Sequence, residues 1–227
     1  MATYQQEHKL LYFGAFGTGS TSVIKALTGQ LHAVQVPEQD IYDEAGARVC
    51  RSKHTTPAEL KRANILDEET YGSCFKFSTV RNPLDFMVSE YLRSKNRWYP
   101  KLDDPDFWLS KAAEGKRKSV RISGTASFPE WIEYELGNSK ERLLHSKYIE
   151  DADFVMYFDT LTDDFAEAMK RAGVRKTVTL PHKNPTKQRE TDEGERIDFT
   201  TFYDKRSAEL VYRAFRSEFE MHDFKLV

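Results

Sequence analysis

The stretch from Leu10 to Leu27 reads LLYFGAFGTGSTSVIKAL, and it decides the fold. A short apolar run, long enough for a buried strand, leads into three glycines and a Ser/Thr cluster, after which apolar residues have helical spacing. A strand, a glycine-rich turn and a helix present backbone N–H groups and a helix N-terminus to an anion. The sequence therefore predicts a phosphate- or sulfate-binding loop. The residues expected to contact the anion are Gly17, Thr18, Gly19, Ser20, Thr21 and Ser22.

The loop differs from the Walker A pattern of ATPases. Gly14 and Gly19 have the spacing of its two glycines, but Ser20 stands where that pattern requires a lysine. This difference disfavours an ATPase or an ordinary kinase.

A dinucleotide-binding turn is a second alternative. Gly17 and Gly19 fit its first two glycines, whereas Ser22 replaces the third. Glu38 or Asp40 stands about 20 residues further on, where such a fold places its ribose-binding acid. An NAD(P)-dependent oxidoreductase therefore stays open, as does a glycine-rich turn that binds nothing.

Length and composition indicate one globular domain over residues 1–227, with 39% hydrophobic residues and a net charge of −2. This charge gives no basic field for nucleic acid. No apolar run approaches the roughly 20 residues of a membrane span, and the polar N-terminus lacks a signal-peptide core. Cys50 and Cys74 show no metal-ligand spacing with histidine, and we expect both to be reduced thiols in a cytoplasmic protein.

A second informative stretch spans residues 74–93. Residues 74–80 have the pattern of a strand, and Asn82-Pro83 has that of an N-cap followed by the first helical residue, in a helix reaching about Trp98. Arg81 thus stands between the end of a strand and the start of a helix. Ser89 lies two turns along, on the face of Asn82. We predict that Arg81 and Ser89 converge on one anion; an Arg81–Asp85 surface ion pair is the alternative.

A third stretch places His54 in the loop before a helix. Thr56, Pro57 and Glu59 together form a strong helix-start signal of N-cap, first-turn proline and capping-box acid. Open α/β sheets carry their chemistry in such loops. Histidine also titrates near neutral pH, which makes His54 the candidate general base.

The rest of the chain completes an α/β pattern. A strand is expected over 153–158, a helix over 160–172 and a final helix over about 204–220. The basic run 111–121 has the composition of a solvated loop, with a lid or an acceptor-binding edge as the alternative. Residues 180–194 form a long loop in which Lys187 and Arg189 are candidates for closing over a nucleotide. The predicted fold is a three-layer α/β/α domain with a mainly parallel sheet and a P-loop-like turn.

Several of these stretches together resemble the sulfotransferases that use 3′-phosphoadenosine-5′-phosphosulfate (PAPS), above all the carbohydrate-type branch and its short bacterial relatives. Residues 16–22 resemble the family's 5′-phosphosulfate loop, and residues 75–91 its 3′-phosphate motif. Residues 53–60, 157–165 and 180–184 are similar to three further family segments. The likeness runs from about 10 to 224 and is weakest over 95–150.

The resemblance implies in-line transfer of a sulfuryl group from PAPS to a hydroxyl of a sugar, a glycolipid or a small metabolite, with PAP as product. It implies that Arg81 and Ser89 hold the 3′-phosphate, and it supports His54 as the base. His182 is a weaker candidate base. A nucleotide-binding protein without transferase activity is the alternative from another class.

One position departs from the family pattern. Gly17 stands where these enzymes usually have a lysine that contacts the phosphosulfate. We expect either reduced catalytic power or another cation in that role. The candidates are Lys25, Lys53 and Lys76.

Overall fold

The computed structural model describes residues 2–181 and 197–226. These residues form two compact units. Unit 1 holds residues 2–81 and 145–181, and unit 2 holds residues 82–144 and 197–226. The single domain expected over 1–227 stays a prediction. Within the described residues, no helix is long and apolar enough to cross a membrane.

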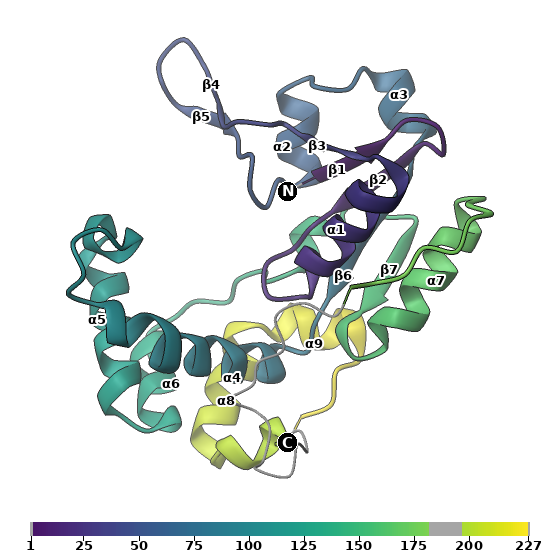
Figure 1. Cartoon of the computed structure of the whole chain (residues 1–227). Helices are drawn as coiled ribbons and strands as arrows, with labels where there is room; N and C mark the ends of the chain where they lie inside the picture. The colour runs from purple at the N-terminus through teal and green to yellow at the C-terminus, as the bar shows by residue number, and fades with distance from the viewer. Residues whose placement is uncertain (1, 182–196, 227) are drawn as a thin grey trace. The chain divides into compact units, whose positions relative to one another are not determined.

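Unit 1 is built on a five-stranded sheet in the order β3-β1-β2-β6-β7 (Figure 1). β2 pairs with β6, and β6 with β7, in parallel, while β1 pairs antiparallel with β2 and β3. Four strands therefore run in one direction, which confirms the predicted mainly parallel sheet. The strands are β1 (Ala2–Gln5), β2 (Leu10–Phe13), β3 (Val34–Val36), β6 (Phe75–Val80) and β7 (Phe154–Tyr157).

Strand β1 was not expected, because the N-terminal residues are mostly polar. Thr3 is nevertheless completely buried, and the Gln5 side chain donates a hydrogen bond to the carbonyl of Leu31 at 3.2 Å. The Gln5 amide can occupy a buried strand because its hydrogen bond is made, whereas the Thr3 hydroxyl has no hydrogen-bond partner among the described residues. Composition alone reveals neither outcome.

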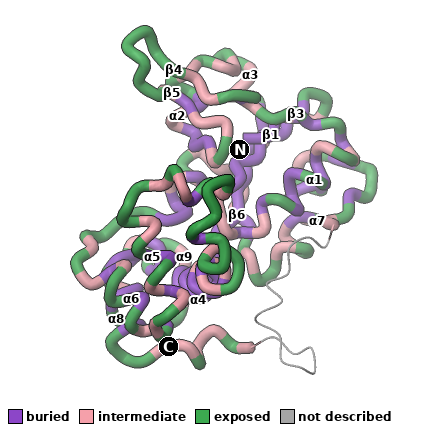
Figure 2. The backbone as a smooth tube through the Cα atoms, turned by 60° about the vertical axis from the view of Figure 1, so that its left-hand side comes forward, coloured by how far each residue is buried: buried purple, intermediate pink, exposed green. Residues whose placement is uncertain are grey.

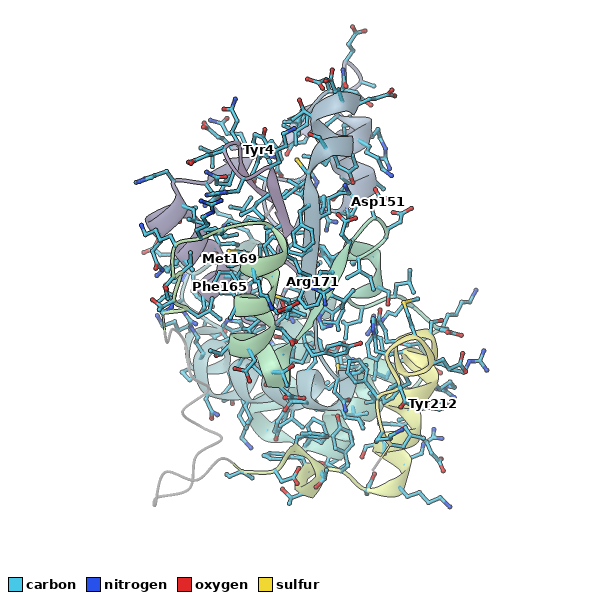
Figure 3. All side chains as sticks on the ribbon, turned by 90° about the vertical axis from the view of Figure 1, so that its right-hand side faces the viewer. Tyr4, Asp151, Phe165, Met169, Arg171 and Tyr212 are labelled. Atoms are coloured by element: carbon cyan, nitrogen blue, oxygen red, sulfur yellow. The ribbon has the colours of Figure 1, made fainter. Side chains whose placement is uncertain are left out.

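The two faces of the sheet follow the alternation of side chains along β2. Leu10 and Tyr12 pack with α1 (Ser20–Leu31) and α7 (Leu161–Arg171) on one face. In Figure 3, α7 carries the labelled Phe165 and Met169, both of which belong to this core.

Leu11 and Phe13 pack on the other face, where Leu60 of α2 (Pro57–Arg62) joins the cluster and Tyr71 of α3 (Glu68–Ser73) lies against it. Unit 1 thus has helices on both sides of its sheet. In Figure 2 the buried colour follows β1, β6 and α1, whereas the hairpin of β4 (Ile41–Tyr42) and β5 (Arg48–Cys50) is largely exposed.

Unit 2 is helical. Its α-helices are α4 (Pro83–Arg93), α5 (Glu114–Thr125), α6 (Phe128–Leu136), α8 (Lys205–Ala214) and α9 (Arg216–His222). The α4 helix ends earlier than expected and continues as a π-helical turn over Ser94–Trp98.

Two expectations for unit 2 were wrong. The basic run 111–121 lies mostly in helix α5, not in a loop. The same helix contains Gly124, where a larger residue would clash, because a Cβ there would stand 2.2 Å from the ring of Tyr99. The final helix is divided at Phe215, where the carbonyl of Ala214 accepts a hydrogen bond from the N–H of Arg142 at 2.9 Å.

Candidate functional site

The glycine-rich loop connects the carboxyl end of β2 to the start of α1. Gly17 and Gly19 have φ values of 72° and 75°. This left-handed region is strained for residues with a Cβ, so the two glycines allow a turn that other residues would resist.

In the first half of the loop, two backbone carbonyls accept hydrogen bonds from side chains. The Gly14 carbonyl lies 3.1 Å from Nδ1 of His54, and the Ala15 carbonyl accepts from the Thr18 hydroxyl at 2.9 Å. Thr18 is completely buried, so its hydroxyl holds the loop from within.

The next two carbonyls are bound by side chains from distant segments. The Phe16 carbonyl lies 3.0 Å from Nε2 of His145, and the Gly17 carbonyl accepts from Nη1 of Arg81 at 2.8 Å. Four consecutive carbonyls, from Gly14 to Gly17, are therefore directed at side chains of unit 1.

The four carbonyls set the direction of the N–H groups of residues 15–18, and the Gly19 carbonyl, which accepts from Ser22, sets that of the Ser20 N–H. In a trans peptide the N–H of the following residue is directed opposite to the carbonyl. In the part of the chain that the structure describes, the backbone N–H groups of Gly19, Ser20 and Thr21 donate no hydrogen bond. An anion at this turn would meet N–H groups and the positive end of α1 instead of carbonyl oxygens.

The hydroxyl groups at the helix start differ in exposure. Ser20 and Ser22 are each 8% exposed, whereas Thr21 is exposed. The Ser22 N–H donates to the Gly19 carbonyl at 2.9 Å, which closes the first turn.

His54 lies beside the loop with a defined tautomer. A carbonyl can only accept, so Nδ1 carries the hydrogen directed at Gly14, and the neutral ring keeps a lone pair on Nε2. Burial lowers the pKa of His54, with the Gly14 hydrogen bond acting in the opposite direction. His54 also has a φ of 57°, and such strained residues cluster at functional sites.

A pocket of about 750 Å³ is lined by residues between 38 and 54, His54 among them. The lining comes from the β4–β5 hairpin and the chain on either side of it. It is charged and polar, with Tyr42 as its aromatic side chain. Both of its arginines form ion pairs: Arg48 pairs with Asp40 at 3.3 Å and Arg51 with Glu59 at 2.8 Å.

Arg81 is 5% exposed and its guanidinium lies 4.0 Å from the ring centroid of Phe158. Together with the bond to Gly17, this contact places the arginine at the glycine-rich loop. Ser89 is buried on α4 of unit 2, and its convergence with Arg81 stays a prediction.

The three lysines that could replace a lysine at position 17 lie in different places. Lys76 donates to the carbonyl of Cys74 at 2.7 Å, at the start of β6, whereas the loop follows the end of β2. Lys25 and Lys53 are exposed, on α1 and next to His54. Lys147, which the sequence did not single out, lies 5.8 Å from the ring centroid of Phe16.

His145 was also missed. It belongs to no recognisable motif and stands 64 residues from Arg81, whose backbone N–H lies 3.3 Å from its Nδ1. No local pattern could have revealed this contact. His182, Lys187 and Arg189 lie outside the described residues.

A family model described as "Sulfotransferase family" matches residues 1–225. No curated protein and no solved structure matches the chain.

Proposed function

The chain belongs to the sulfotransferase family, and on this premise we propose that it transfers a sulfuryl group from PAPS to an acceptor hydroxyl. The observation that carries the proposal is the glycine-rich loop, whose four consecutive carbonyls are held by side chains while amides at the start of α1 donate no hydrogen bond in the described structure. Such a turn suits a phosphosulfate group.

On the donor side, Gly17 to Thr21 would hold the 5′-phosphosulfate through their N–H groups, and Ser22 would add its hydroxyl, because its N–H donates to the Gly19 carbonyl. Arg81 would supply positive charge, since a guanidinium matches phosphate oxygens and here is held against Phe158 and Gly17. The 3′-phosphate roles of Arg81 and Ser89, and the covering roles of Lys187 and Arg189, stay predictions. PAPS, when bound, supplies an activated sulfuryl group with PAP as the leaving group.

On the acceptor side, His54 would act as general base through Nε2. With PAPS bound, the acceptor hydroxyl would give its proton to Nε2 as the sulfuryl group passes to the acceptor oxygen, and PAP would leave with the electron pair of the former sulfur–oxygen bond. The Gly14 carbonyl fixes the ring orientation, and the lowered pKa keeps the ring neutral near pH 7.

The pocket beside His54 is the proposed acceptor site. Its lining has no aliphatic side chain, so burying an apolar acceptor there would leave charged groups without solvent. A hydroxyl-rich acceptor, such as a sugar, can replace the lost water contacts. We therefore favour a sugar or a polar metabolite over a hydrophobic alcohol.

The donor site is tested by calorimetric titration with PAP, with ATP and NAD as controls. We expect micromolar PAP binding that Arg81→Ala abolishes. Arg171→Ala is the matched control, because Arg171 also lies over a phenylalanine of unit 1, at 4.4 Å from Phe154, at the other end of β7 (Figure 3). Absence of PAP binding by the wild-type protein would refute the proposal, and binding of NAD instead would favour an oxidoreductase.

The base is tested with His54→Asn on a panel of sugar acceptors. The Asn amide can still donate to the Gly14 carbonyl and tolerates a positive φ, but it has no group in place of Nε2. We expect the transfer rate to fall by about 10²–10⁴-fold with unchanged PAP affinity. His32→Asn is the control, since His32 has a φ of 55° and is exposed. Tight PAP binding without transfer by wild type would instead indicate a nucleotide-binding protein.

A further inference from the structure

His145 links two parts of unit 1 that are far apart in sequence. Its side chain is completely buried, with Nδ1 3.3 Å from the backbone N of Arg81 and Nε2 3.0 Å from the carbonyl oxygen of Phe16. The ring also lies edge-on to the Phe16 ring, 5.7 Å between centroids. The residue therefore joins the end of β6 to the glycine-rich loop.

The two contacts define the state of the ring. A backbone N–H can only donate, so Nδ1 accepts; a carbonyl can only accept, so Nε2 carries the hydrogen. His145 is therefore a neutral imidazole protonated on Nε2, which is the opposite tautomer to that of His54.

The Phe16 carbonyl needs a hydrogen-bond donor because the residue that follows it is a glycine. Glycine tolerates both signs of φ, so Gly17 imposes little restraint on the Phe16–Gly17 peptide plane. If that plane rotated, the Phe16 carbonyl oxygen would replace the Gly17 N–H on the side where an anion is expected. An oxygen directed at an anion is repulsive, so one rotated peptide would weaken the site.

We propose that His145 is a positioning residue that keeps the loop in its anion-binding form. Its ring does so by hydrogen bonding to the Phe16 carbonyl on one side and to the backbone N–H of Arg81 on the other. The consequence for anion affinity rests on the proposed function, whereas the restraint on the loop does not.

Two substitutions separate the contacts. In His145→Gln the side-chain amide can reach the former Nε2 position and donate to Phe16, while the acceptor for Arg81 is lost. In His145→Asn the amide oxygen can take the place of Nδ1, while Phe16 loses its donor. Each variant removes one of the two hydrogen bonds of His145, so a purely structural role predicts similar losses of thermal stability and similar behaviour otherwise.

The loop is tested in the free full-length chain by nuclear magnetic resonance. The imidazole nitrogen spectrum of wild type should show His145 protonated on Nε2 alone. The amide resonances of residues 16–19 should be single and sharp in wild type and in His145→Gln, and broadened or doubled in His145→Asn. The reverse tautomer, or loop resonances that respond equally to both substitutions, would overturn the proposal.

PAP titration then tests the consequence. We expect His145→Gln to bind within about threefold of wild type and His145→Asn to bind about tenfold more weakly, since loss of one hydrogen bond that favours the anion-binding form shifts that equilibrium by up to about this factor. If wild type does not bind PAP, the proposed function fails, and the resonance comparison still decides the role of His145.

Discussion

Replacing Gly19 with alanine tests the loop geometry that supports the candidate site. Gly19 has a φ of 75°, and a Cβ at this position would stand 2.7 Å from Cδ2 of Leu161 on α7 and 3.4 Å from Cε2 of Phe158. The methyl group therefore meets two obstacles, an unfavourable backbone conformation and an occupied space.

The expected loss of stability can be estimated from these obstacles. A left-handed conformation costs a non-glycine residue about 1–2 kcal/mol. Insertion of a methyl group into packed space costs about 1–3 kcal/mol, and the lower part of this range applies because the Leu161 side chain can move at its end. Alanine also restricts the unfolded chain more than glycine does, which offsets about 0.4–1 kcal/mol of this loss. Gly19→Ala should therefore lose about 2 kcal/mol, or roughly 4–8 °C in Tm for a chain of this size.

The assay is thermal unfolding of Gly19→Ala beside Gly29→Ala. Gly29 lies inside helix α1, which begins directly after Gly19, and it has open space around its Cβ position, so alanine there should raise stability by about 0.5–1 kcal/mol. Opposite signs at the two positions are the expected result. If Gly19→Ala is as stable as wild type, the loop does not have the left-handed conformation described above, and the argument for its amide orientation fails.

Three further predictions concern unit 1. Thr56→Ala should lower the unfolding free energy by about 1 kcal/mol in urea titrations, because it removes the α2 capping box, whereas Thr56→Ser should retain it. Ser78→Ala should cost about 1–3 kcal/mol, since the buried hydroxyl donates to the Phe13 carbonyl at 2.6 Å, with the exposed Ser73→Ala as control. Burial lowers the pKa of His54 in the folded protein, so the unfolded chain binds the extra proton at a higher pH. The unfolding free energy should therefore fall as the pH drops below about 6.5. A His54→Asn chain should show a smaller fall between about pH 7.5 and 5.5.

Local sequence patterns predicted most of unit 1. The apolar run at 10–13, the helical spacing after Gly19 and the N-cap signal at Thr56 each correspond to an observed element. These signals are short-range, since they depend on side-chain alternation, helix periodicity and capping within a few residues. The same reasoning failed for β1, which depends on partners elsewhere in the chain, and for α5, whose glycine and basic residues resemble a loop.

The sequence by itself therefore determined the strand, turn and helix order, the family resemblance and the candidate roles of His54 and Arg81. Only the tertiary structure brought His145 between Phe16 and Arg81, directed the guanidinium of Arg81 to Gly17, and fixed the tautomer of His54. The physical reason is that a local pattern sets backbone conformation, whereas the direction of a carbonyl and the tautomer of an imidazole depend on atoms that folding brings from distant segments.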